Sequence, residues 1–172
     1  MAKKKLTFEV LGPYAVPTSE DSRVIGTEEG PTFFSRNSHL RGRRGAYVFG
    51  VRSGGGIMPV YVGKTKRSYD KECFTADKCL KYTKGLSSYA KGTPVLFFVA
   101  TPRKQKGPPN AKVIKDLEDF LIQNGKARNP DLLNKRGAKE ANWAIRGVLR
   151  TSQVGQPPKA AGAFKRMMGF SK

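Results

Sequence analysis

Two short runs of β-branched and aromatic residues, at 46–51 and 60–63, are joined by a segment that contains three consecutive glycines. Such residues favour strands, and glycine can take the positive φ angles that a tight β-turn requires. Pro59 has no amide hydrogen to donate, which favours an entry or edge position for the second strand. The segment therefore predicts an antiparallel hairpin that carries one tyrosine on each strand, Tyr47 on the first and Tyr61 on the second.

Three further segments have the pattern of strands. Residues 94–101 form a continuous apolar run between a glycine and a proline, so they predict a buried central strand. Residues 5–17 begin with alternating apolar side chains and end in Gly and Pro, and residues 142–150 have the composition of a late strand. Residues 18–44 are rich in Gly, Ser and Arg, and they predict a long, partly ordered loop before the hairpin.

Helical periodicity indicates the remaining elements. Residues 69–89 predict two short helices separated at Gly85, and a last helix follows the prolines at 157–158. Asn110 is a suitable N-cap for a helix over residues 111–123. Apolar side chains recur along one face of that helix, so it is expected to pack against the sheet.

One carboxylate of that helix differs from its neighbours. At about 100° per residue, Glu118 falls at the edge of the apolar face. Lys115, Asp116 and Asp119 point toward water by the same construction. Glu118 is therefore predicted to lie at the rim of the core.

The charge of the chain points to a polyanionic partner. Its 33 Lys and Arg residues against 13 Asp and Glu leave a formal net charge of +20, far more than solubility requires. Nucleic acid, expected to be DNA, is the predicted partner, while a ribosome-associated protein that only neutralises phosphates is an open alternative. The candidate nucleic-acid-binding residues are Arg36, Arg41, Arg43, Arg44, Arg103, Lys104, Lys106, Lys165 and Arg166.

Length and composition exclude several other classes. At 172 residues the chain is expected to form one domain. Cys73 and Cys79 are too few for a disulfide scaffold or a structural zinc site, so they are predicted to be thiols in a reducing compartment. The N-terminal residues lack the apolar segment of a signal peptide, and no stretch is long enough to span a membrane. A soluble cytoplasmic protein with no membrane partner is expected, and its oligomeric state stays open.

Two single residues have a functional and a structural interpretation. His39 is the only histidine, and in an Arg-rich segment it is expected to contact phosphate or solvent rather than to act as an acid or base. Trp143 is the only tryptophan, and we expect it in the core rather than stacked on a base.

Four motifs follow one another in a set order. They are G-x-Y at 45–47, Y-x-G at 61–63, E-x-x-L-I at 118–122 and N-P-D-L-L-N at 129–134. Each string is short, but together with a hairpin, a helical region, an apolar strand and a helix in sequence, they resemble the GIY-YIG nuclease superfamily.

The resemblance covers residues 45–134, about half of the chain. It implies an α/β (α+β) fold with a small three-stranded antiparallel sheet flanked by helices, and a metal-dependent nuclease site on one face of it. Residues 1–44 would then be an extension with a strand and a basic loop. Residues 135–172 would be a basic extension with a strand and a helix.

Residue roles follow from the resemblance. Tyr47 and Tyr61 match the two tyrosines of the family, and Lys64 matches a lysine often found after the second motif. Glu118 matches the carboxylate that binds one divalent metal, Mg²⁺ or Mn²⁺, and Asn134 matches a late asparagine that fixes the site through hydrogen bonds. An ammonium beside a phenol favours the phenolate, so Lys64 is expected to assist one tyrosine as general base; which of the two stays open.

One position departs from the family. Lys71 stands where an arginine is usual in the first helix, and a lysine cannot offer the planar fork with which arginine holds two phosphate oxygens. Arg67 lies one helical turn earlier and could supply a guanidinium. Either both cations hold the scissile phosphate, or the enzyme is slow or inactive.

The predicted function is a metal-dependent endonuclease that hydrolyses phosphodiester bonds in DNA. The alternative is a nucleic-acid-binding protein on the same scaffold with weak or no catalysis, as Lys71 could signal. Each residue also has a structural interpretation: strand tyrosines are usually packing residues, Glu118 could be a boundary residue paired with a lysine, and Asn134 could be a turn residue. Their joint occurrence in this order favours the functional interpretation.

Overall fold

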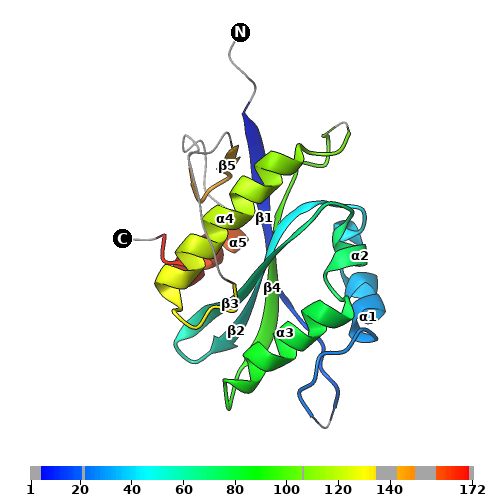
Figure 1. Ribbon diagram of the computed structural model, residues 1–172, viewed down its shortest axis with the longest axis vertical. Coiled ribbons are helices and arrows are strands. Elements are labelled where there is room, and N and C mark those ends of the chain that lie inside the picture. The colour runs from blue at the N-terminus through cyan, green and yellow to red at the C-terminus, as the bar shows by residue number, and fades with distance from the viewer. Residues whose placement is uncertain (1–4, 21, 106, 135–142, 150–157, 171–172) are drawn as a thin grey trace.

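Five strands form one sheet in the order β3-β2-β4-β1-β5 (Figure 1). The computed structural model describes residues 5–20, 22–105, 107–134, 143–149 and 158–170, and these strand and helix assignments refer to them. The strands are β1 Leu6–Ala15, β2 Gly45–Ser53, β3 Gly56–Thr65, β4 Thr93–Ala100 and β5 Trp143–Ile145.

Neighbouring strands are antiparallel except β1 and β5, which are parallel. In the described part of the chain the sheet therefore has five strands, not the three that the resemblance implies. The difference arises because β1 and β5, from the two extensions, continue the sheet beyond β4. The mixed α/β class is as predicted.

The hairpin and the central strand are confirmed. Ser53 pairs with Gly56, so that Gly54 and Gly55 form the turn between β2 and β3. β3 is an edge strand, in agreement with Pro59, which pairs at a bulge where the register shifts. β4 lies between β2 and β1, and its residues from Val95 to Ala100 are fully buried.

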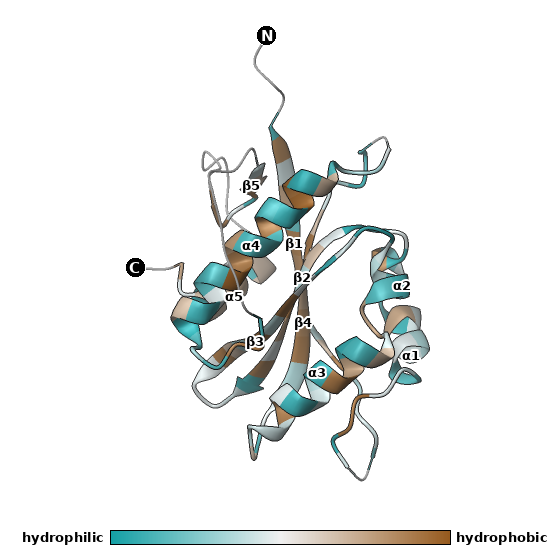
Figure 2. Ribbon diagram, viewed as in Figure 1, coloured by the Kyte–Doolittle hydropathy of each residue, from teal (hydrophilic) through white to brown (hydrophobic). Residues whose placement is uncertain are grey.

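Helices cover both faces of the sheet (Figure 1). One face, called the α4 face, is covered by α4 and α5, and the other, called the α3 face, by α1, α2 and α3. Figure 2 shows apolar strands between helices whose outer sides are hydrophilic. The helices are α1 Glu29–Arg36, α2 Tyr69–Glu72, α3 Ala76–Ser87, α4 Ala111–Arg128 and α5 Lys159–Met168.

The loop predicted for residues 18–44 is wrong in part, because α1 and a short 3-10 helix at Ser38–Leu40 lie within it. Phe33 and Phe34 of α1 are 1% and 2% exposed and join the core of the α3 face. Eight residues are too few for a stable isolated helix, so burial of the two rings stabilises this one. Local periodicity is weak over such a length.

The break between the two short helices also lies elsewhere than predicted. It falls between α2 and α3, at residues 73–75, while Gly85 lies inside α3. A Cβ at Gly85 would come within 2.1 Å of Val60 Cγ1, so this glycine serves the close approach of α3 to β3. Its role is packing rather than helix termination.

Helix α4 begins as predicted and runs further. The Asn110 side chain accepts a hydrogen bond from the Lys112 amide at 2.9 Å, which caps the first turn. The helix continues past Gln123 to Arg128.

The late strand is shorter than predicted, since β5 covers only Trp143–Ile145. Trp143 is fully buried, as expected. In the described part of the chain, no helix has the length and apolar character to cross a membrane.

Candidate active site

The motif residues lie on opposite faces of the hairpin. Tyr47 and Tyr61 belong to the core of the α3 face, whereas Val62 belongs to the core of the α4 face. Side chains alternate along a strand, so Lys64, two residues after Val62, points to the same face as Val62. The candidate residues therefore straddle the edge strand β3 instead of sharing one face.

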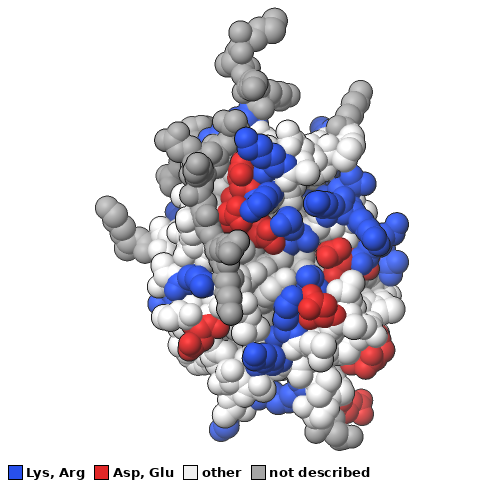
Figure 3. Space-filling model, viewed as in Figure 1, with Lys and Arg blue, Asp and Glu red and all other residues white. Residues whose placement is uncertain are grey.

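Lys64 and Glu118 form an ion pair across the α4 face. The Lys64 ammonium contacts Oε2 of Glu118, which α4 places over β3. The two side chains are 27% and 15% exposed, so the pair lies at the rim of the core, where the helical periodicity predicts Glu118. Figure 3 shows acidic side chains gathered over α4 with basic ones beside them. The expectation that Lys64 assists a tyrosine hydroxyl is wrong, because strand alternation directs it to Glu118.

Asn134 holds the chain that follows α4 against β3. Its Oδ1 accepts from the Val62 amide, and its Nδ2 donates to the Val62 carbonyl, both at 2.7 Å. Two further bonds run alongside, from the Leu133 amide to the Val60 carbonyl and from Asn129 Nδ2 to the Pro59 carbonyl. The segment after α4 thus forms hydrogen bonds with backbone groups along the outer edge of β3.

Tyr47 is fully buried beneath the helices of the α3 face. Burial raises its pKa well above 10, and the neighbouring Cys73 and Tyr61 raise it further. A hydrogen bond with the Tyr82 hydroxyl acts to lower the pKa, but burial outweighs it. A Cβ at Gly63 would come within 2.4 Å of the Tyr47 hydroxyl, which explains in physical terms why a glycine stands there in the Y-x-G motif. Tyr47 is a neutral phenol at physiological pH and is poorly suited to be a general base.

Tyr61 has a different environment. It is 7% exposed, and two ammonium groups lie near its ring, with Lys78 Nζ at 5.7 Å and Lys81 Nζ at 5.2 Å from the centroid. Both lysines also contact Asp77, which stands at the start of α3. Burial acts to lower the pKa of Lys78, but Tyr61 and Asp77 outweigh it and the net pKa is raised.

Sequence reasoning missed Lys78 and Lys81. Their spacing of three positions places them on one face of a helix, and this spacing is the feature from which a pair of neighbouring cations could have been predicted. Nothing in the local sequence indicates that this face meets Tyr61, because that contact depends on how α3 packs on the hairpin.

Arg67 and Lys71 are exposed and lie where the chain leaves β3 and enters α2. Lys71 lines a shallow pocket with Arg41 and Asp70. Figure 3 shows basic side chains gathered over the segment that links β3 to α2. These two cations are thus at the end of β3 that also carries Lys64.

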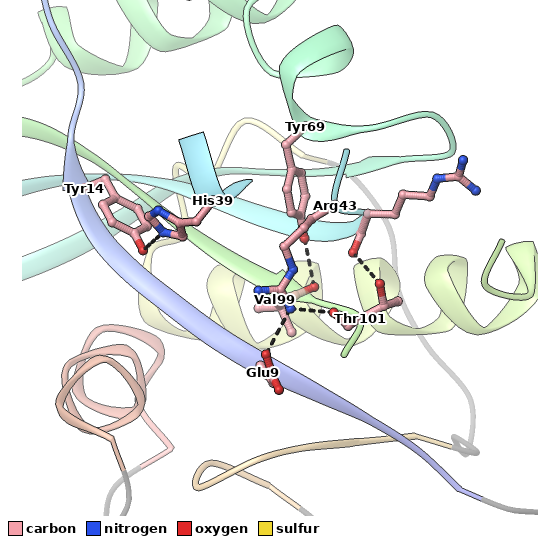
Figure 4. Close-up of polar contacts among 8 residues, drawn as sticks. Glu9, Tyr14, His39, Arg43, Tyr69, Val99 and Thr101 are labelled. Atoms are coloured by element: carbon pink, nitrogen blue, oxygen red, sulfur yellow. Dashed lines mark hydrogen bonds and ion pairs between the residues drawn. The ribbon is translucent and has the colours of Figure 1, made fainter. Parts of the chain in front are cut away.

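The predicted nucleic-acid-binding residues do not form one surface, because α1 carries Arg36 on the α3 face and α5 carries Lys165 on the α4 face. Arg43 is largely buried: its Nη2 donates to Glu9 Oε2 at 2.9 Å and to the Thr101 carbonyl at 2.6 Å (Figure 4). Lys106 lies outside the described residues. Of the others, Arg41, Arg103, Lys104 and Arg166 are exposed and Arg44 is half-buried.

The histidine and the cysteines have structural environments. His39 is exposed, and its Nε2 lies 2.8 Å from the Tyr14 hydroxyl in a hydrogen bond (Figure 4). Cys73 and Cys79 are buried free thiols, and burial raises the pKa of Cys79 to about 11. Both thiols are therefore protonated and unreactive at neutral pH.

The chemistry of the donors limits how a metal could bind. No group of three or more His, Cys, Asp or Glu side chains within the described ranges could hold an ion together. A divalent ion at Glu118 would have one protein carboxylate and would take its other ligands from water and phosphate, an arrangement that Mg²⁺ accepts. Because Lys64 contacts Oε2, the other carboxylate oxygen, Oε1, is the one that fits this role.

The fold and this arrangement define a mixed α/β protein with a five-stranded sheet, helices on both faces and a polar cluster beside the outer strand of the hairpin. No protein-family model, no curated protein and no solved structure matches the chain. The resemblance to a nuclease superfamily therefore rests on the motif residues themselves.

Proposed function

We propose that the protein is a metal-dependent endonuclease that hydrolyses phosphodiester bonds in DNA, on a scaffold similar to the GIY-YIG nucleases. Its site, called the β3-edge site, consists of Tyr61, Lys64 and Glu118 with Lys78 and Lys81 beside them. The observation that carries the proposal is the contact between Lys64 and Glu118, because two motif residues 54 positions apart meet at a half-buried carboxylate.

Glu118 is the residue that would hold Mg²⁺ or Mn²⁺. When bound, the metal supplies positive charge to the phosphoryl oxygens and to the leaving oxygen. Lys64 neutralises Glu118 and holds its carboxylate at the edge of β3. Arg67 and Lys71, at the end of the same strand, bind the phosphates of the substrate strand.

Tyr61 is the general base in this proposal. Because Tyr61 lies on the α3 face and Glu118 on the α4 face, the proposal requires the substrate phosphate to lie across the edge of β3, where both can reach it. There Tyr61 would take a proton from the attacking water, and the ammonium groups of Lys78 and Lys81, which lie near its ring, would favour the phenolate form. Tyr47 packs beneath the hairpin and supports the backbone at Gly63. Asn134 supports the opposite side of β3 through Val62.

The second candidate function is DNA binding without efficient cleavage. It is favoured by the same ion pair, because the Lys64 ammonium already neutralises the carboxylate charge that would attract a metal. A lysine at the position of the usual arginine also favours it. Both functions predict affinity that falls steeply as salt rises.

Cleavage of supercoiled plasmid separates the two functions. With Mg²⁺ or Mn²⁺, the native protein is expected to nick the plasmid, and Glu118→Gln is expected to lose at least about a hundredfold in rate. Asp119→Asn is the matched control, since Asp119 lies on the same helix and pairs with Lys115 instead of a motif residue. The control should cut like the native protein.

Two outcomes decide against the endonuclease. Equal nicking by the native protein and Glu118→Gln would show that Glu118 has no role in the reaction. Salt-sensitive binding by the native protein without any metal-dependent nicking would favour the second function.

Glu118→Gln should change the free energy of unfolding by about 1 kcal/mol or less, because the ion pair is partly exposed. Urea unfolding measures this change.

A further inference from the structure

A pocket separate from the β3-edge site lies where β4 ends and β2 begins. Its polar side chains come from two segments, Arg43 and Arg44 before β2, and Thr101, Arg103 and Gln105 after β4. Glycines and prolines of the same two segments complete its lining. We call it the arginine pocket.

The arginine pocket has a strong positive charge. Three arginines line it, and no acidic side chain is among the described residues that do so. Arg43 is bound by Glu9, but neither Arg44 nor Arg103 forms an ion pair with a described residue. At least two positive charges are therefore uncompensated at the pocket, which favours an anion of high charge density.

Two polar atoms in the pocket residues are buried without a partner. They are Nε of Arg43 and Oε1 of Gln105, within the described part of the chain. The Arg43 side chain is only 9% exposed, and its Nη2 is held by Glu9 and the Thr101 carbonyl, as Figure 4 shows. Leaving a buried donor unpaired costs about 1–3 kcal/mol, so a small movement of the lining that let an anion oxygen accept from Nε would recover this free energy. The Gln105 oxygen is itself an acceptor and makes no bond to an anion.

Hydrogen bonds hold part of the pocket lining in place before any ligand binds. The Gln105 amide donates to the Pro102 carbonyl at 3.1 Å, and the Thr101 amide donates to the Arg44 carbonyl at 3.0 Å, which ties the two segments together. The guanidinium of Arg43 is fixed by its own hydrogen bonds.

Strand register relates this pocket to the β3-edge site. Ala46 of β2 pairs with Lys64 of β3, and Arg44 lies two residues before Ala46. Two residues along a strand span about 6.6 Å. The pocket and the ion pair of Lys64 with Glu118 therefore lie at the same end of the hairpin, on one path along the sheet.

We propose that the arginine pocket binds a phosphate group of a nucleic-acid strand. Planar guanidinium groups match the oxygens of a phosphate, and three of them around one pocket suit a phosphate better than a carboxylate. Because the pocket lies beside the β3-edge site, we assign to it a phosphate next to the scissile one. This assignment rests on the proposed function. The phosphate site itself does not, because it needs neither metal nor cleavage.

Binding of a fluorescent single-stranded oligonucleotide, followed by anisotropy in EDTA, tests this proposal. The double variant Arg44→Gln with Arg103→Gln is expected to weaken binding by roughly tenfold and to lower the slope of log K against log salt by about 0.7, the value for one phosphate on a single strand. The control is Arg52→Gln, an exposed arginine toward the opposite end of β2. It should change binding by less than about threefold, and a double variant that behaves like this control would overturn the proposal.

The same assay identifies the source of the phosphate. Oligonucleotides with a 5′-phosphate and with a 5′-hydroxyl are compared on the native protein and the double variant. A loss in both indicates an internal backbone phosphate, and a loss confined to the 5′-phosphorylated strand indicates a terminal one; each outcome supports the pocket. Because EDTA prevents cleavage, failure of the nuclease proposal in the plasmid assay leaves this result intact.

A second measurement uses only the native protein, so it does not require any variant to fold. Inorganic phosphate is titrated into the ¹⁵N-labelled native protein against chloride at the same ionic strength. Saturable shifts at Arg43 Nε and at the Gln105 side-chain amide are expected. Shifts spread evenly over the exposed lysines and arginines, with none confined to these two groups, would overturn the proposal.

Discussion

At the scale of single residues, the two hairpin tyrosines differ in what surrounds their hydroxyl groups. Tyr47 is fully buried and its pKa is raised well above 10 by burial, whereas Tyr61 is slightly exposed and has the ammonium groups of Lys78 and Lys81 near its ring. The motif treats the two tyrosines alike. Their chemistry is distinguished only by position relative to α3.

Exchange of each tyrosine for phenylalanine should separate their roles. Tyr61→Phe is expected to slow plasmid nicking by roughly 10²–10⁴, the usual contribution of a general base. Tyr47→Phe should leave the rate within about threefold of the native value, because the Tyr47 hydroxyl is buried beneath the α3 face and does not reach the substrate in this proposal. Loss of nicking in Tyr47→Phe with full activity in Tyr61→Phe would contradict this assignment.

The sequence contained part of the information on Lys64. Lys64 lies three positions after Tyr61, and two side chains an odd number of positions apart on a regular strand point to opposite faces. This period of two already disfavoured the pairing of Lys64 with Tyr61. Its actual partner, Glu118, was expected at the rim of the core, but only the packing of α4 on β3 brings the two together.

At the scale of elements, α3 shows how a glycine is selected by packing. Gly85 stands in the last turn of α3, and within a helix glycine is otherwise unfavourable by about 0.5–1 kcal/mol relative to alanine. Val60 Cγ1 would lie 2.1 Å from an added Cβ. The β-branched Val60 is stiff at χ1 and cannot move away readily.

Alanine at two helical glycines should therefore have opposite effects. Gly85→Ala is expected to destabilise the protein by about 1–3 kcal/mol through overpacking. Gly162→Ala in α5 should stabilise it by about 0.5–1 kcal/mol, because the nearest atom to its added Cβ is Arg166 Nη1 at 3.8 Å. Urea unfolding measures both, and adding Val60→Ala to Gly85→Ala should restore part of the loss. Equal stabilisation by both alanines would contradict the packing role.

Element boundaries were predictable where the determinants are local. Asn110 marks the start of α4, and the glycines at 54–56 mark the hairpin turn. α1 was not predictable in the same way, because its eight residues are stabilised by the burial of Phe33 and Phe34 against distant parts of the chain. Short helices of this kind have little periodicity of their own.

At the scale of the whole molecule, the core of the α3 face is rich in buried ionisable groups. Burial raises the pKa of Tyr47, Tyr69 and Tyr82 well above 10, and it raises that of Cys73 well above 9. The folded protein therefore retains these protons at a pH where the unfolded chain releases them.

Stability should fall in alkaline solution for this reason. Below about pH 8 these groups are largely protonated in both states and have little effect on the free energy of unfolding. Above about pH 9 the unfolded state alone loses the Cys73 proton, and above about pH 10 it also loses the tyrosine protons. Each of these groups lowers stability by about 1.4 kcal/mol per pH unit once it is deprotonated in the unfolded state. Urea unfolding between pH 8 and 11 measures this slope.

Tyr82→Phe provides the check on the alkaline slope. Its ring stacks on Phe49 with centroids 4.4 Å apart, and phenylalanine can keep this contact. The variant should be about as stable as the native protein at pH 8, and its slope above pH 10 should be smaller by about 1.4 kcal/mol per pH unit, the contribution of one tyrosine. An unchanged slope would show that Tyr82 does not retain its proton in the folded state.

The sequence by itself determined the hairpin, the buried strand β4, the start of α4 and the excess of positive charge. These follow from turn residues, periodicity, capping and composition, which act over a few neighbouring positions. Only the tertiary structure decided that the sheet has five strands, that Lys64 meets Glu118, and that Arg43, Arg44 and Arg103 surround one pocket. The reason is that strand order and helix placement depend on burying apolar surface between segments far apart in the chain, and this long-range packing leaves little trace in any short stretch of sequence.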